Sequence, residues 1–175
     1  MKEKKMIIVN GPSCVGKSTI IDLLFKVKVD IFWLKYDAIK RLFIDYSYPK
    51  DFDKIMKLLT LIGKDRIDNE DDILIEGPLC RFAFENIFEY AKHKGYIFYE
   101  FNLEAPVEVL IKRFENRVRL PINGIKINTS IDRYLEIIDS YEKFKNKDAK
   151  TFNTSIMSAK AISDDMLAIL VKESF

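Results

Sequence analysis

The sequence is poor in the residues that build metal and redox sites. Its 175 residues include two cysteines, Cys14 and Cys80, and a single histidine, His93. The cysteines do not have the short spacing of metal or dithiol motifs, and one histidine argues against a His-based triad or metal site. His93 lies in AKHKG, where Gly95 predicts a helix end and the basic residues suit the negative end of that helix.

Long apolar runs and an excess of either charge are also absent. No apolar stretch approaches the roughly 18–20 residues of a membrane span. The 29 basic and 27 acidic residues give a net charge of +2, and their interspersion predicts neither a nucleic-acid nor a membrane partner. The start, MKEKKMIIVN, indicates a first strand rather than a signal peptide. We therefore expect one globular domain over residues 1–175 in a reduced, cytoplasmic setting.

Apolar segments alternate with segments of helical periodicity along the whole chain. Strands are expected at 6–10, 31–35, 72–76, 96–102 and 150–154. Helices are expected at 17–27, 37–44, 52–64, 81–94, 106–117, 131–144 and 158–171. Right-handed crossovers between these strands predict an α/β fold: a doubly wound, mostly parallel five-stranded sheet with helices on both faces.

A phosphate-binding loop, or P-loop, is the strongest motif. GPSCVGKST matches G-x-x-x-x-G-K-[ST] in full and lies between an expected strand and an expected helix. Glycines allow the backbone to approach phosphates closely, and successive N–H groups with the helix N-terminus bind the anion. We predict that the nucleotide, most simply ATP with Mg²⁺, is bound by Gly11, Pro12, Ser13, Cys14, Val15, Gly16, Lys17, Ser18 and Thr19, with Lys17 on the β- and γ-phosphates.

An apolar strand ending in a carboxylate often accompanies a P-loop, because Mg²⁺ is held by the loop hydroxyl and a second acid. Here Asp72–Glu76 ends in Glu76, so Ser18 and Glu76 are the predicted metal ligands. The alternative is that Glu76 is only an acid at a helix N-terminus. Arg81 follows, and either binds a phosphate of the acceptor or pairs with a surface acid.

Basic residues gather where a helix runs into a loop containing proline and glycine. Arg113 and Arg117 are four apart on one helix face, and Arg119 begins the loop. Mobile arginines that close over a γ-phosphoryl group stabilise its charge and exclude water, so we expect a lid at about 113–128. Arg113 and Arg117 would then contact the nucleotide, with Arg117 catalytic and Arg119 near the acceptor. The alternative is a solvated face that pairs with Glu108 or Glu115.

Together these residues resemble the small P-loop kinases of the nucleoside-monophosphate-kinase-like superfamily. LIEGPLCR is similar to the adenylate-kinase pattern, with Glu76 in place of aspartate, and IKRFENR to the lid arginines. MIIVNGPSCVGKSTIIDLL followed by WLKYDAIKRL looks more like the hydroxyl kinases, including chloramphenicol phosphotransferase and polynucleotide-kinase-like proteins. That resemblance implies a general base at Asp37.

Asp37 also has a suitable position by itself. It follows the expected second strand, on the same sheet edge as the P-loop, where a carboxylate can take the proton of an acceptor hydroxyl. Lys40 or Arg41, one turn further on, would orient the acceptor or hold the carboxylate ionised. The alternative is that Asp37 only stabilises a helix N-terminus.

Three functions remain open at this point. The leading hypothesis is an ATP-dependent kinase acting on the hydroxyl of a small molecule, such as a nucleoside, sugar or antibiotic. The second is a nucleoside-monophosphate kinase, whose acceptor is a phosphate. The third is a GTPase-like switch, which would need N-K-x-D for guanine; residues 146–149 read NKDA and lack the final aspartate.

Overall fold

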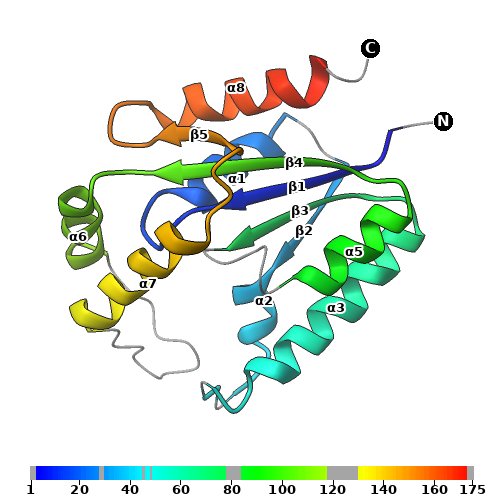
Figure 1. Cartoon of the computed structure of the whole chain (residues 1–175), viewed down its shortest axis with the longest axis horizontal. Coiled ribbons are helices and arrows are strands. Elements are labelled where there is room, and N and C mark those ends of the chain that lie inside the picture. The colour runs from blue at the N-terminus through cyan, green and yellow to red at the C-terminus, as the bar shows by residue number, and fades with distance from the viewer. Residues whose placement is uncertain are drawn as a thin grey trace.

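The fold is a three-layer α/β arrangement, described by a computed structural model for residues 3–27, 30–44, 46–47, 49–77, 84–117 and 130–172. Five parallel strands form one sheet in the order β2-β3-β1-β4-β5 (Figure 1). This confirms the predicted fold class. The strands are β1 Lys5–Asn10, β2 Ile31–Lys35, β3 Asp72–Gly77, β4 Ile97–Glu104 and β5 Lys150–Asn153.

Helices connect the strands and cover both faces of the sheet. They are α1 Lys17–Phe25, α2 Tyr36–Lys40, α3 Phe52–Asp68, α5 Glu85–His93, α6 Val107–Glu115, α7 Ile131–Phe144 and α8 Ala159–Lys172.

The C-terminal ends of two helices differ from the prediction by about one turn. α2 ends at Lys40, because the N–H groups of Leu42 and Phe43 bond to carbonyls three residues back, which tightens the chain into a turn. α3 continues one turn beyond the expected end because buried Ile67 extends its apolar face. None of the helices in the described ranges combines the length and apolar character that crossing a membrane requires.

The end of α5 is stabilised by a glycine, as the sequence predicts. Gly95 has a φ of 76°, and its N–H donates to the carbonyl of Lys92 while the N–H of Tyr96 donates to that of Ala91. This is a Schellman motif, in which the last helical carbonyls find partners. His93 is exposed at this helix end, away from the sheet edge described below.

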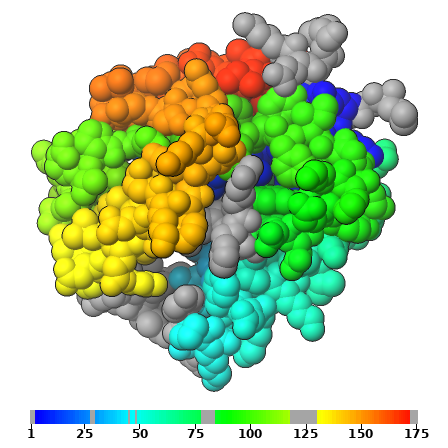
Figure 2. Space-filling model, in the orientation of Figure 1, coloured from blue at the N-terminus to red at the C-terminus, as the bar shows by residue number. Residues whose placement is uncertain are grey.

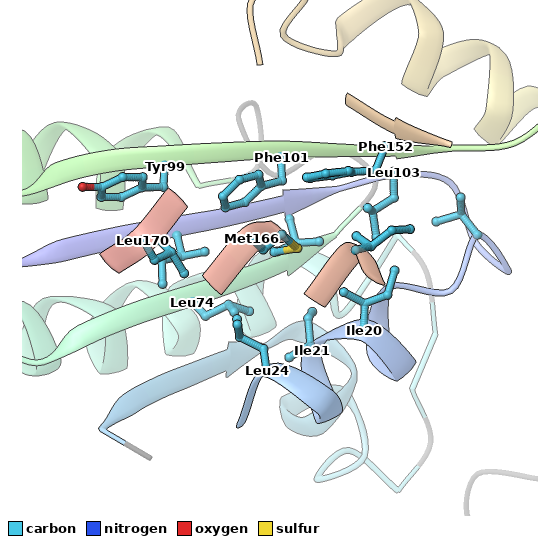
Figure 3. Packing of buried hydrophobic residues seen from close by; sticks show 14 of the residues in the cluster. Ile20, Ile21, Leu24, Leu74, Tyr99, Phe101, Leu103, Phe152, Met166 and Leu170 are labelled. Atoms are coloured by element: carbon cyan, nitrogen blue, oxygen red, sulfur yellow. The ribbon is translucent and has the colours of Figure 1, made fainter. Parts of the chain in front are cut away.

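Apolar side chains point alternately to the two faces of the sheet and form a core on each face. On one sheet face, Ile7 and Val9 of β1 pack with α1 and α8, and Figure 3 shows part of this cluster around Met166. On the other face, Met6 and Ile8 pack with α3 and α5. Because every strand is parallel, all five carboxyl ends lie along one edge of the sheet, which is where ligands bind in such folds.

Candidate active site

The P-loop joins β1 to α1 at this edge, and both of its glycines have positive φ. Gly11 and Gly16 have φ values of 154° and 106°. A Cβ on Gly11 would lie 2.7 Å from the carbonyl oxygen of Leu103 and 2.8 Å from Cγ1 of Val15, so a side chain has no room. Cys14 also has a positive φ, of 64°. Three residues of the loop therefore have positive φ, a backbone form that occurs in the nests that bind anions.

Lys17 starts α1 and lies folded against its own loop. Its Nζ donates to the carbonyl oxygens of Gly11, at 2.8 Å, and Pro12, at 2.9 Å. The side chain is buried, with 9% of its surface exposed. These contacts hold the ammonium group against the loop, where phosphates would bind.

Ser18 and Glu76 meet across the sheet edge, as predicted. Ser18 Oγ donates to Glu76 Oε1 at 2.9 Å. Glu76 Oε2 is buried without a hydrogen bond and lies 3.7 Å from Lys35 Nζ on the adjacent strand. Lys35 is a component that the sequence analysis missed; its signal would have been its position at the end of β2, beside Glu76 in register.

The oxygen atoms of Ser18 and Glu76 fit a magnesium ion. Mg²⁺ prefers one or two carboxylates together with substrate phosphates and water, and Ser18 and Glu76 supply a hydroxyl and a carboxylate next to the P-loop. The buried Glu76 Oε2 without a hydrogen bond is the observation that favours a cation here. No group of three or more His, Cys, Asp or Glu side chains suited to a metal was found among the described residues.

The two described arginines of the expected lid make different contacts. Arg113 donates from Nη1 to Thr154 Oγ1 and from Nη2 to the Thr154 carbonyl, both at 2.8 Å, and from Nη1 to the Val15 carbonyl at 3.4 Å. It thus joins α6 to the P-loop and to the turn after β5. Arg117 is exposed, and its Nη1 lies 3.3 Å from Ser13 Oγ. In the described part of the chain, neither arginine forms an ion pair with the nearby glutamates.

A tyrosine that the sequence analysis missed supports the P-loop from α7. The Tyr134 hydroxyl donates to the Ser13 carbonyl at 2.7 Å, and its ring stacks on Phe114 with centroids 4.1 Å apart. Burial, with a smaller contribution from Cys14, raises the pKa of Tyr134, so its hydroxyl remains a donor at neutral pH. Tyr134 therefore links α6, α7 and the P-loop.

Asp37 lies where the sequence predicts, in the first turn of α2 directly after β2. Its side chain is exposed, and its carboxylate makes no hydrogen bond or ion pair with the residues that the structure describes. The N-cap of α2 is Lys35, with no side-chain cap hydrogen bond, so Asp37 is not the capping residue. Lys40 Nζ lies 4.5 Å from the Tyr46 ring centroid, whereas Arg41 is exposed outside the cavity described next.

One cavity of about 1180 Å³ is lined by P-loop residues, Glu76 and Asp37. One side is formed by α6, α7 and the β5–α8 turn, with Arg113, Arg117 and the previously unrecognised Arg133. The other side is formed by α2, α3 and the start of α5. Figure 2 shows these two sides as the yellow-to-orange surface of α7 and the cyan and green surfaces of α3 and α5.

Two predicted site residues, Arg81 and Arg119, lie outside the described residues, as does most of the expected lid. The cavity instead includes side chains that no motif identified. These lining residues are Lys35, Tyr36, Tyr46, Phe52, Met56, Phe84, Arg133, Ile137, Thr154 and Met157.

Comparisons with known proteins agree with this architecture. A sugar kinase from Janibacter sp. HTCC2649 aligns with a TM-score of 0.65 at 16% identity, over 95% of this chain and 94% of that one. The tunicamycin resistance protein of Deinococcus radiodurans gives 0.65 at 15% identity, over 97% and 96%. The APS kinase of Mycobacterium tuberculosis, in complex with AMPPNP and APS, gives 0.63 at 14% identity, over 97% and 99%. At these identities the likeness shows a shared fold.

Sequence comparison adds the family. No curated protein matches the chain. A family model described as an AAA domain matches residues 7–127, a segment that begins in β1 and includes the P-loop, Asp37, Glu76 and Arg117. This segment is more than half of the chain, which therefore belongs to the AAA domain family and has the fold of the P-loop kinases.

Proposed function

We propose that the protein is an ATP-dependent kinase that transfers the γ-phosphoryl group of Mg·ATP to a hydroxyl of a small molecule. One observation carries the proposal: a single cavity contains both the P-loop and the Asp37 carboxylate. The structural neighbours named as kinases support phosphoryl transfer, and the APS kinase complexed with AMPPNP supports an adenine nucleotide as donor.

The residues divide the reaction between them. The P-loop N–H groups and Lys17 would bind the phosphates, while Ser18 and Glu76 would hold Mg²⁺, which supplies charge neutralisation when bound. The acceptor oxygen forms a bond to the γ-phosphorus as the bond from that phosphorus to the β–γ bridging oxygen breaks. The electron pair of that bond leaves with ADP. Asp37 takes the hydroxyl proton, and Arg117 stabilises the charge on the transferred group.

The charges in the cavity favour a hydroxyl acceptor over a phosphate. A phosphate acceptor is already an anionic nucleophile and needs arginines rather than a base. Among the described lining residues, the arginines lie on the α6–α7 side. The α2–α3 side has a carboxylate, Asp37, and Lys40, which lies over Tyr46. A carboxylate would repel an acceptor phosphate but can accept the proton of an alcohol.

Nucleoside-monophosphate kinase activity remains the alternative. The segment after Glu76 carries Arg81, which the resemblance to adenylate kinases associates with an acceptor phosphate. The two functions differ in product: a phosphorylated hydroxyl in one, and a nucleoside diphosphate in the other.

The test compares Asp37→Asn with Asp53→Asn, after an ATP-consumption screen of nucleosides, nucleotides, sugars and antibiotics has identified the acceptor. Asp53 is the matched control, because it is an exposed aspartate in the first turn of α3 and does not line the cavity. Asp37→Asn should reduce kcat by about 10²-fold or more with unchanged Mg·ATP affinity. Asp53→Asn should leave both unchanged. Near-normal turnover by Asp37→Asn, or a nucleoside monophosphate as the best acceptor, would contradict the proposal.

A further inference from the structure

We infer that the acceptor is a hydroxyl compound bearing a flat aromatic or heteroaromatic ring, rather than a polyol sugar. The inference rests on the proposed function and narrows its substrate class. It comes from the side of the cavity formed by α2, the turn after it, α3 and the start of α5, which we call the acceptor side. Its apolar lining consists of Tyr36, Tyr46, Phe52, Phe84 and Met56.

The cavity has room for a second molecule beside the nucleotide. A site for one drug-sized ligand encloses roughly 300–1,000 Å³, whereas this cavity encloses about 1180 Å³. The phosphate-binding residues and the arginines occupy the P-loop and the α6–α7 side. The acceptor side is therefore the part of the cavity that the second molecule would contact.

The rings of the acceptor side hold one another in place. The Tyr36 and Phe52 rings are tilted by 40° with centroids 6.1 Å apart. The hydroxyls of Tyr36 and Tyr46 lie 3.1 Å apart and hydrogen-bond to each other. These phenols already share one hydrogen bond, and the rings make up most of the surface of the two tyrosine side chains that line the cavity. Such surface favours a planar ring in offset or edge-on contact.

The described residues of this side offer few hydrogen-bonding groups to a polyol. A polyol loses water from several hydroxyls on binding, and each buried hydroxyl needs a partner. Among the described residues, the charged groups on the acceptor side are Asp37 and Lys40, because Lys35 lies next to Glu76. Asp37 suits one reacting hydroxyl, and Lys40 lies over the Tyr46 ring. The other described side chains that line this side are aromatic or thioether, which suits a ring.

Two sources share this chemistry: a nucleoside, whose base supplies the ring, and an aryl-substituted alcohol. The experiment measures kcat/KM with Mg·ATP for adenosine and thymidine, for 2-phenylethanol, for glucose and ribose, and for AMP. At least one ring-bearing alcohol should exceed both sugars by about tenfold, from contacts with two rings. Turnover of the nucleosides alone identifies a base as the ring, and turnover of 2-phenylethanol alone identifies an aryl group.

The outcomes separate this inference from the proposed function. Glucose or ribose matching the ring-bearing alcohols would overturn the inference and leave a hydroxyl kinase. AMP phosphorylated on its phosphate as the best acceptor would overturn the proposed function itself. Failure of adenosine, thymidine and 2-phenylethanol alike would overturn the inference.

Ring removal tests the acceptor side directly. Tyr46→Leu and Phe52→Leu should each raise KM for the ring-bearing acceptor by about three- to tenfold, with KM for Mg·ATP unchanged. Tyr46→Phe keeps the ring and should restore the acceptor KM. Phe144→Leu is the control, because this exposed phenylalanine of α7 does not line the cavity. Equal effects of Tyr46→Leu on acceptors with and without a ring would overturn the inference.

Discussion

Replacing Arg113 by lysine tests how the P-loop is held against the turn after β5. The guanidinium group makes two hydrogen bonds of 2.8 Å to Thr154 and a longer one, of 3.4 Å, to the Val15 carbonyl. A lysine keeps the charge but has one compact ammonium group, which cannot reproduce the planar fork. The substitution therefore isolates the geometry of the arginine from its charge.

The magnitude follows from the bonds that are lost. A hydrogen bond from a charged donor contributes about 1.5–3 kcal/mol. Lysine at 113 can retain one of the two short bonds, so the free energy of unfolding should fall by about 1.5–3 kcal/mol. The melting temperature should fall by roughly 2–4 °C for each kcal/mol lost. A moderate rise in KM for ATP should accompany this, because the P-loop loses part of its support.

Urea denaturation of Arg113→Lys, Thr154→Ala and the double variant measures the coupling, which should lie between about 0.5 and 3 kcal/mol for groups in contact. Arg117→Lys is the control, since the contacts of Arg117 with Ser13 and Cys14 are exposed and their loss should change stability by less than about 0.5 kcal/mol. If Arg113→Lys kept full stability but had a lower kcat, the guanidinium would act on the nucleotide. Its structural role, holding the P-loop against the turn after β5, would then be refuted.

Three further predictions concern turnover and pH. Lys17→Ala should abolish phosphoryl transfer while circular dichroism shows an intact fold, and unchanged turnover would exclude the kinase proposal. Arg117→Ala should lower kcat on the order of 10³-fold with little change in ATP KM; a rise in KM alone would make it a ground-state ligand. Burial, followed by nearby acids, raises the pKa of Tyr96 to about 12, so above pH 10 the unfolded chain loses this proton first. The contribution of Tyr96 to the free energy of unfolding should then fall by up to about 1.4 kcal/mol for each unit that the pH rises from 10 to 12. Urea denaturation of Tyr96→Phe should show a smaller fall over the same range.

The P-loop, Glu76 and Asp37 could be predicted because each of them is marked by a local sequence signal. The P-loop motif fixes its own backbone, and Glu76 and Asp37 follow directly from the ends of apolar strands. In each case the sequence signal and the structural cause lie within a few residues of each other. This is why the sequence could place Ser18, Glu76 and Asp37 at the same edge of the sheet, while their roles stay predictions.

The opposite is true of the residues that arrive from distant segments. In α7 the apolar Phe144 is 52% exposed, whereas Tyr134, which carries a hydroxyl, is fully buried. The buried side of α7 is set by the packing of Tyr134 on Phe114 and on the P-loop. Tyr134 lies more than 100 residues from its P-loop partner Ser13 in the chain. Such a contact leaves no local pattern, and the aromatic acceptor side, assembled from α2, α3 and α5, was missed for the same reason.

The position of the Glu76 carboxylate depends on how side chains alternate between the two faces of β3, more than on contacts within the site. Leu74 and Trp33 pack on the α1 face of the sheet, whereas Ile73 and Ile75 pack on the α3 face. Since side chains alternate along a strand, Glu76 shares the face of Leu74 and so meets Ser18 of α1. A register shift of one residue in β3 would turn Glu76 toward the apolar α3 core and expose Leu74 to the wrong face. The apolar residues that bury each face of the sheet therefore also fix the carboxylate beside the P-loop.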